Sequence, residues 1–231
     1  MLIERSSFAS SITKYGFLIV GGLDRGGRMT DSVELLSAIG EKFRSKRQFP
    51  KQISSGCLSP IDDTTVVLSG GYHYGFTITN SIWKYDFIRD EWEEMIPMKI
   101  GRAQHSCVVQ EDSRSNQKKL VVAGGTVVGF SGTKSVEIYN FHTKTWTNGP
   151  FLPLAISLSQ LIPDGINGGC ILVAGRAIMN SQTERLTSVM HLSSESRDWK
   201  ILGRHLKIGR DSHVAMLIPE NLIQCSNLDF N

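Results

Sequence analysis

The sequence of 231 residues lacks several features that would assign it to a common functional class. It contains no run of about 18 apolar residues, so we expect no membrane span. Its formal charge of +3 is small, and its one cluster of basic residues, at 44–47, is short, so nucleic acid is not an expected partner. Residues 1–7 carry charges and lack the apolar core of a signal peptide. The remaining interpretation is an ordinary globular protein, with 40% hydrophobic and 20% charged residues.

Signatures of catalysis and of metal binding are missing as well. The six histidines are His73, His105, His142, His191, His205 and His213. No two of them stand at a metal-ligand spacing such as His-x-x-x-His. The sequence also contains no Cys-x-x-Cys, no nucleophile elbow and no phosphate-binding glycine loop. We therefore predict that the protein is not an enzyme and that it binds neither a metal nor a cofactor.

What the sequence does contain is a repeat of about 50 residues in four copies. Each copy has a glycine pair after an apolar run, or an alanine in place of the first glycine: Gly21-Gly22, Gly70-Gly71, Gly124-Gly125 and Ala174-Gly175. A serine and two large apolar residues, four and then seven positions further on, complete the pattern: Ser32, Leu36 and Phe43; Ser81, Tyr85 and Trp92; Ser135, Tyr139 and Trp146; Ser188, Leu192 and Trp199. One register held through four copies indicates a repeat protein.

Each copy divides into four short extended segments, which predicts an all-β fold. In the third copy the segments are 105–110, 119–123, 135–140 and 144–148, separated by polar turns. Valine, isoleucine and aromatic residues fill them, and the apolar spacing of three and four that marks an amphipathic helix is absent. A repeat of this length built from strands is typical of a four-stranded blade of a β-propeller.

On these residues the sequence resembles the kelch repeat family. The match extends over about 5–219 and is most complete in the second and third copies. The first copy departs from the family pattern with Leu36 and Phe43, and the fourth with Ala174. The resemblance implies four-stranded blades stacked around an axis, with the glycines in tight turns and the aromatic residues between adjacent blades.

We predict a single propeller domain, 1–231, with four blades and one extra inner strand. The predicted boundaries are 5–50, 51–99, 100–153 and 154–208 for the blades, 209–219 for a partial fifth unit and 220–231 for a tail. Because neither end supplies what the other lacks, we interpret the propeller as an incomplete ring and the chain as part of a longer one. In the alternative, the extra inner strand, 213–218, docks into the first blade and closes a ring of four.

The four cysteines permit two disulfides without requiring them. Cys57 and Cys107 occupy equivalent inner-strand positions in successive copies, and Cys170 opens a second strand, where a small apolar side chain packs well. We expect buried free thiols there, with a disulfide as the alternative, and the sequence leaves the state of Cys225 open. The localisation is unknown, and only the absence of an Asn-x-Ser/Thr sequon favours an intracellular setting.

Strand alternation predicts a face on which arginines and aromatic residues gather. In an up-and-down blade, the loop between the second and third strands opens on the same face as the loops that join blades. The residues predicted for this face are Arg5, Arg25, Arg28, Tyr72, His73, Tyr74, Phe76, Arg102, Arg176 and Arg210. Arginine binds carboxylates through two parallel hydrogen bonds, and aromatic rings supply anchoring area. The loop 72–76 is the most specific candidate, since it holds three aromatic residues where a turn needs none.

This face and the resemblance predict a non-catalytic module, or scaffold, for protein–protein interaction. The expected partner is a protein, and the arginines favour an acidic peptide segment of it. One alternative is a structural fragment of a larger multi-domain kelch protein, of the kind that serves as a substrate receptor in ubiquitin ligases. The other is a metal-dependent oxidase on a kelch scaffold, as in copper radical oxidases with this fold, although no residue here marks the metal ligands.

Overall fold

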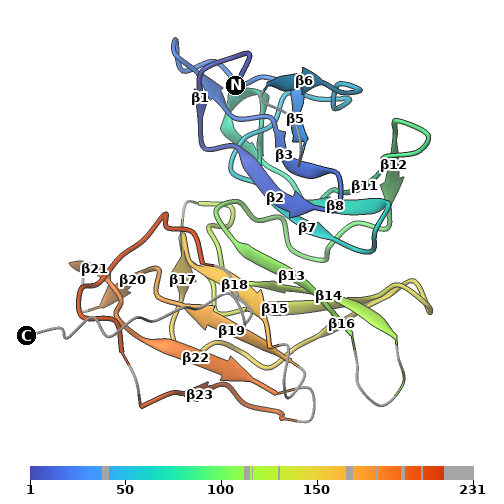
Figure 1. The fold of residues 1–231 in the computed structure, drawn as a ribbon. Coiled ribbons are helices and arrows are strands. Elements are labelled where there is room, and N and C mark those ends of the chain that lie inside the picture. Colours follow the sequence, from blue (N-terminus) through green and yellow to red (C-terminus); the bar gives the residue numbers. More distant parts are fainter. Residues whose placement is uncertain are drawn as a thin grey trace, which may run out of the picture.

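In the residues that the structure describes, four antiparallel sheets of four strands follow one another, and the strands of each sheet are ordered as in the sequence. The computed structural model of the protein describes residues 1–37, 42–111, 115, 117–129, 131–164, 169–179, 182–193, 196–203 and 205–215. The first strand of each sheet contacts the first strand of the next sheet, so the sheets are blades arranged side by side (Figure 1). The predicted all-β propeller fold is confirmed.

The strand bounds agree with the repeat. Blade 1 consists of β2 (Ala9–Thr13), β3 (Gly16–Val20), β5 (Val33–Ser37) and β6 (Phe43–Ser45). Blade 2 consists of β7 (Cys57–Pro60), β8 (Thr65–Ser69), β11 (Ile82–Asp86) and β12 (Glu91–Met95). Blade 3 consists of β13 (Ser106–Glu111), β14 (Lys118–Ala123), β15 (Val136–Asn140) and β16 (Thr145–Asn148). Blade 4 consists of β18 (Gln160–Pro163), β19 (Cys170–Val173), β22 (Val189–Leu192) and β23 (Lys200–Ile201).

A second set of short strands lies on one face of the propeller. They pair the segment that leads into a blade with the loop between the second and third strands of that blade. The strands are β1 (Arg5–Ser6) with β4 (Leu23–Asp24), β17 (Ile156–Ser157) with β20 (Arg176–Met179) and β21 (Gln182–Arg185), and, within one loop, β9 (Tyr72–His73) with β10 (Thr77–Ile78) around the 3-10 turn η1 (Tyr74–Phe76). We call this surface the loop face; β1, β17, β20 and β21 lie on the left in Figure 1.

The repeated glycines are explained by a close approach of two backbones. Gly70 has a φ of +54°, and a Cβ atom there would lie 2.2 Å from the carbonyl oxygen of Arg102, so only glycine fits without displacing the next blade. The N–H of Gly71 donates to that same carbonyl oxygen at 2.8 Å. The equivalent bonds are Gly22 to Ile53, Gly125 to Ile156 and Gly175 to Arg210. Backbone hydrogen bonds therefore fix each blade to the segment that leads into the next.

A further series of backbone bonds passes from blade to blade just before each inner strand. The five residues of this series have positive φ, between 51° and 55°: Ser7, Ser55, Gln104, Leu158 and Ser212. Each of the last four donates its N–H to the carbonyl oxygen of the one before it, at 2.7 to 3.0 Å. Ser212 thus has the geometry of a fifth lead-in. Residues 213–215 form no strand, and the rest of the predicted fifth inner strand lies outside the described residues. The incomplete ring stays a prediction.

The core lies between the blades, where the aromatic couplets pack. Tyr85 and Tyr139 are buried, with ring centroids 4.9 Å from Trp92 and 5.1 Å from Trp146. The tryptophan in or just before each of the fourth strands β12, β16 and β23 also donates its indole N–H to a carbonyl oxygen of the segment after the preceding blade. These bonds are Trp92 to Arg47 at 3.1 Å, Trp146 to Ile96 at 2.9 Å and Trp199 to Pro150 at 3.0 Å. The tryptophans therefore join neighbouring blades by hydrogen bonding as well as by packing.

The cysteines correct one expectation. Cys57 of β7 and Cys107 of β13 form a disulfide between the inner strands of blades 2 and 3, so the expected free thiols are wrong at these two positions. Their equivalent repeat positions bring them together, because adjacent inner strands lie side by side. Cys170 is a buried free thiol, and its burial raises its pKa to about 12, so it is a packing residue. Cys225 lies outside the described residues.

Candidate functional site

The loop 72–76 of blade 2 places two aromatic side chains in solvent on the loop face. Tyr72 is buried beneath the loop and contacts Phe76 edge to face, with ring centroids 5.9 Å apart. Above it, Tyr74 is 85% exposed and Phe76 50% exposed. Gly75 and Phe76 both have positive φ, 69° and 58°, and a phenylalanine in this region is strained. The backbone therefore holds the two rings outward at a conformational cost that the blade beneath does not require.

His73, between these rings, supports the loop. It is half-buried, and its Nδ1 lies 3.1 Å from the carbonyl oxygen of Gln52 in the segment that leads into the blade. Burial lowers its pKa, so the ring is neutral at pH 7. His73 is placed to hold the loop against the lead-in segment, and it presents less surface to a partner than Tyr74.

Two predicted face residues, Arg5 and Arg102, are buried, so the expectation that they are exposed to a partner is wrong. The Arg102 side chain is fully buried, and its Nη2 donates to Glu137 Oε1 at 2.7 Å. Its Nη1 donates to the carbonyl oxygens of Gly124 at 2.8 Å and Ser135 at 3.0 Å. Arg5 makes the equivalent contacts in blade 1, with Glu34, Gly21 and Ser32. These guanidinium groups hold the glycine turn of their blade, because they carry several donors in a fixed fork.

The same two positions are apolar in the other blades. One position is the lead-in residue whose carbonyl oxygen accepts from the preceding blade's glycine, and the other is two residues after the repeated serine. They hold Ile53 and Trp83 in blade 2, and Ile156 and Met190 in blade 4. Each apolar pair is buried within one hydrophobic cluster. Blades 1 and 3 therefore use a buried ion pair where blades 2 and 4 use apolar packing.

The remaining predicted arginines do reach the surface of the loop face. Arg25 and Arg28 lie in the exposed turn after β4, where Arg28 Nε is 3.3 Å from Asp24 Oδ2. A backbone hydrogen bond from Arg28 lowers the pKa of Asp24, so that carboxylate stays charged. Arg210 is exposed, and its Nε contacts the carbonyl oxygen of Ile208 at 3.5 Å. Arg176 is partly exposed on β20.

Blade 4 contains two functional candidates that the sequence did not indicate, Arg185 and Asp211. Arg185 lies directly opposite Arg176 in the β20–β21 pair, and both guanidinium groups contact Asp211 Oδ2, at 2.8 Å from Arg176 and 3.2 Å from Arg185. Burial alone would raise the pKa of Asp211, but the hydrogen bond and charge of Arg176 lower it. A hairpin register that pairs residues 176 and 185 is the signal that would have revealed this cluster.

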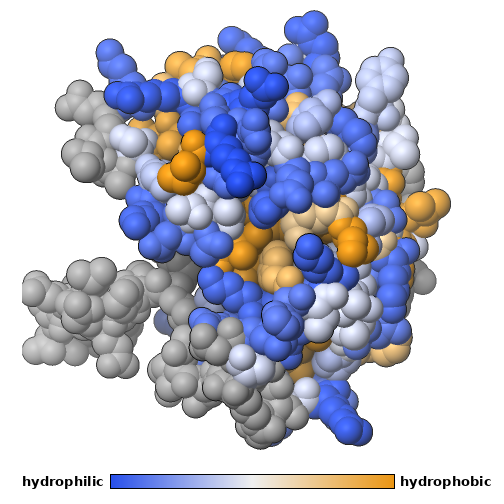
Figure 2. Space-filling model, turned by 90° about the vertical axis from the view of Figure 1, so that its right-hand side faces the viewer, coloured by the Kyte–Doolittle hydropathy of each residue, from blue (hydrophilic) through white to orange (hydrophobic). Residues whose placement is uncertain are grey.

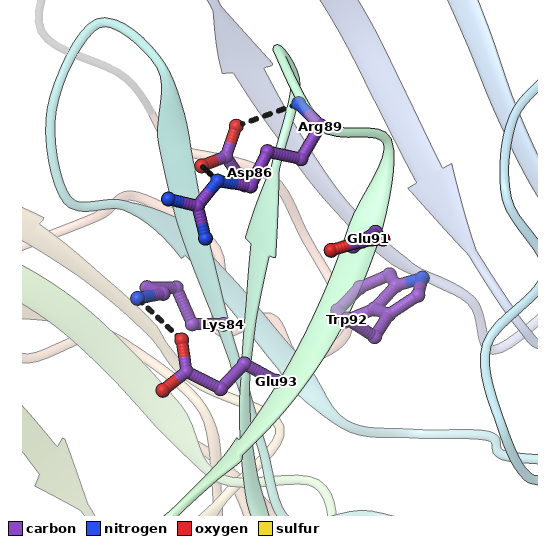
Figure 3. A pocket seen from close by; sticks show the side chains of 6 residues that line it. All are labelled: Lys84, Asp86, Arg89, Glu91, Trp92 and Glu93. Atoms are coloured by element: carbon purple, nitrogen blue, oxygen red, sulfur yellow. Dashed lines mark hydrogen bonds and ion pairs between the residues drawn. The ribbon is translucent and has the colours of Figure 1, made fainter.

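The opposite side of the molecule and the outer strands of blade 2 were compared with the loop face. Figure 2 shows the side that lies to the right in Figure 1, where polar residues predominate and apolar atoms gather at the height of the inner strands. Figure 3 shows a cavity of about 240 Å³ on blade 2, lined in part by Lys84, Asp86, Arg89 and Glu93. Lys84 Nζ is 2.7 Å from Glu93, and Arg89 Nε is 3.9 Å from Asp86. Each cation there has its own carboxylate, and Glu91 adds one further negative charge, so this cavity offers no surplus cation to an acidic ligand.

Other kinds of site were sought in the same residues. In the part of the chain that the structure describes, no three histidine, cysteine, aspartate or glutamate side chains are grouped so that they could hold a metal ion. No helix within the described ranges is long and apolar enough to cross a bilayer.

The fold and the repeated contacts define the class of protein, a β-propeller of four-stranded blades. The chain resembles Kelch-like protein 40 of Xenopus laevis, at 23% identity over 88% of this chain and 33% of the relative. It also resembles Kelch repeat and BTB domain-containing protein 12 of Danio rerio, at 25% identity over 95% of this chain and 38% of the relative. With the glycine pairs and aromatic couplets, these likenesses support the predicted resemblance to the kelch repeat family.

The chain spans little more than a third of the length of these two relatives. A shorter match, 33% identity over 82 residues, joins 36% of the chain to 22% of the F-box/kelch-repeat protein SKIP30 of Arabidopsis thaliana. The solved structure of YjhT superposes with a TM-score of 0.68 at 15% identity, over 90% of this chain and 68% of that one, and this likeness shows the fold alone. No protein-family model matches the chain.

Proposed function

We propose that the protein is a non-catalytic interaction module that binds a segment of a partner protein on the loop face. The observation that carries this proposal is the loop 72–76, in which Tyr74 and Phe76 stand in solvent on a strained backbone above the buried Tyr72. Exposed aromatic rings on a rigid support are typical of the anchoring residues of protein interfaces. Exposed arginines on the same face, Arg25 and Arg28, supply donors for carboxylates.

The names of the relatives agree with this proposal. Several are described as kelch-repeat proteins that also carry a BTB domain or an F-box. A second candidate function follows from them: the chain serves as the recognition part of a longer protein whose other domain performs the remaining task. Both candidates place recognition on the propeller, and they differ in whether binding alone is the function.

Site-specific photo-crosslinking tests the proposed face. A photoreactive phenylalanine replaces Tyr74 in one variant and Ile88 in the matched control; Ile88 is 70% exposed in the turn between β11 and β12, on the other face. We expect a partner to be captured at position 74 and not at 88, and capture to be lost when Phe76→Ala and Arg28→Glu are added. Circular dichroism melting curves confirm that each variant is folded. Equal capture at both positions, or capture that the two added substitutions leave unchanged, would refute the loop face as the interface.

A further inference from the structure

The hairpin β20–β21 of blade 4 carries an excess of positive charge around a cavity. The cavity has a volume of about 410 Å³ and is lined by Arg176, Thr183, Arg185 and Gly209. Thr183 and Arg185 are two residues apart on β21, so their side chains lie on the same side of the strand. Arg176 lies directly opposite Arg185 on β20. Like charges directly opposite one another destabilise a strand pair unless an anion lies between them.

Asp211 supplies only part of that anion. Both arginines contact the same oxygen of this carboxylate, Oδ2, while its charge balances only one of them. Arg210, the next residue along the chain, adds a further exposed positive charge. Within the described residues, the Nη atoms of Arg185 have no hydrogen-bond partner, and its side chain is 64% exposed. The cluster therefore keeps free guanidinium donors and a net positive charge at the cavity.

Gly209 allows the segment 205–211 to lie close to β21. A Cβ atom at this position would lie 2.2 Å from the carbonyl oxygen of Arg185, so any other residue would push the 205–211 segment away from the hairpin. The segment is further fixed by the bond from the N–H of Arg210 to the carbonyl oxygen of Leu186 at 3.1 Å. Asp211 is thereby held against the two arginines, while the Arg185 side chain remains largely exposed.

We propose that Arg176 and Arg185 form a binding site for a single carboxylate, supplied by an aspartate or glutamate of the partner segment. The free fork of Arg185 matches the two oxygens of a carboxylate, and one negative charge neutralises the surplus that Asp211 leaves. A phosphate group, with nearly two negative charges, matches this surplus less well. The source of the carboxylate rests on the function proposed above; the site itself rests on the charge balance of the hairpin.

Titration of the full chain with short peptides tests the site. The probes are acetylated, amidated tetraglutamate, the matched tetraglutamine and inorganic phosphate, at constant ionic strength, with the side-chain Nε–H resonances of the arginines observed by NMR. We expect tetraglutamate to shift the signals of Arg176 and Arg185. Arg185→Gln should weaken its binding at least about tenfold, the loss expected for a hydrogen bond to a charged group. Asp211→Asn removes the competing carboxylate and should tighten it.

Arg89→Gln is the matched control, because Arg89 is exposed and also paired with one aspartate, Asp86, in a turn outside the loop face. Its loss should leave the affinity unchanged. Equal binding of tetraglutamine, tighter binding of phosphate than of tetraglutamate, or an Arg185→Gln variant that binds as the wild type does would each overturn the carboxylate site. Such a result with photo-crosslinking at position 74 intact would leave the loop face as an interface and reject only this site.

Discussion

Removing the buried carboxylate of blade 3 gives a strong test of how the blades are held together. In Glu137→Ala, the guanidinium group of Arg102 remains fully buried but loses its counter-charge. Breaking a buried ion pair in this way costs about 3–5 kcal/mol, because an uncompensated charge is left in a medium of low polarity. For a protein of this size, 1 kcal/mol corresponds to roughly 2–4 °C, so Tm should fall by about 6–20 °C.

The structure also predicts a double variant that removes both charges and should be more stable than Glu137→Ala. Blade 4 holds Ile156 and Met190 at the two equivalent positions, so Arg102→Ile with Glu137→Met copies a pair that the fold already accommodates. Replacing a buried ion pair by well-packed apolar residues is often neutral or stabilising. The Gly124 and Ser135 carbonyl oxygens lose the Arg102 donor in this double variant, and each of them left without a partner should limit the gain by about 1–3 kcal/mol. The N–H groups of Lys99 and Ile100 lose the Glu137 acceptor in the double variant and in Glu137→Ala alike.

The Tm of the double variant should therefore be well above that of Glu137→Ala, although the double variant has two substitutions and Glu137→Ala has one. Thermal and urea unfolding followed by circular dichroism measures both, with Glu91→Ala as the control for loss of an exposed carboxylate, where we expect a change within about 0.5 kcal/mol. A double variant that unfolds at or below the single variant would refute the reasoning, since it would show that the two blades' positions are not interchangeable.

Three further predictions concern His105, the disulfide and Trp146. Burial lowers the pKa of His105 to about 3, so on acidification the unfolded state binds a proton before the folded state does. The free energy of unfolding should therefore fall by about 3 kcal/mol between pH 7 and pH 4. In His105→Gln the urea midpoint should depend less on pH, and a dependence equal to that of the wild type would contradict this. Reduction of Cys57–Cys107, or Cys57→Ser with Cys107→Ser, should lower the free energy of unfolding by about 4 kcal/mol, the loop entropy of a 50-residue separation; alkylation of both thiols without reductant would show that the bond is absent. Trp146→Phe removes the hydrogen bond to Ile96 and part of the packed ring, so it should cost more than the about 1 kcal/mol of the bond but less than the about 3–5 kcal/mol of Trp146→Ala; no measurable loss for Trp146→Phe in urea unfolding would contradict a contribution from the bond.

The sequence predicted the blades because their determinants recur in a fixed register. The glycine at position 70 is required by a backbone contact of 2.2 Å, and the same contact recurs at positions 21 and 124. Strand bounds in blade 3 were predicted to within one residue at each end for the same reason. A requirement that repeats with the architecture leaves a repeating trace in the sequence, and such a trace can be recognised without coordinates.

The candidate site was predicted less well, and the errors have a common cause. Arg5 and Arg102 were assigned to the exposed face from loop position alone, but they recur in one register, and recurrence indicates a structural role: both are buried against a glutamate of their own blade. Arg185 and Asp211 were missed because they meet only through the β20–β21 register and the packing of a later segment against that hairpin. The disulfide was named only as the alternative to free thiols, because equivalent positions in two neighbouring blades do not show by themselves that the two sulfur atoms come within bonding distance.

The residues outside the repeat are therefore the ones to assign to function. Backbone bonds such as that from Gly71 to the Arg102 carbonyl oxygen join each blade to the next whatever the side chains are, so the fold tolerates an ion pair in one blade and an apolar pair in the next. The loops above these contacts are free to differ, and two of them do so in ways that packing does not require: the strained, exposed rings of 74–76, and the paired arginines of β20–β21 with a single carboxylate. If recognition resides in such departures, grafting a plain turn in place of 73–77 should abolish binding at the loop face while the propeller melts as a folded unit.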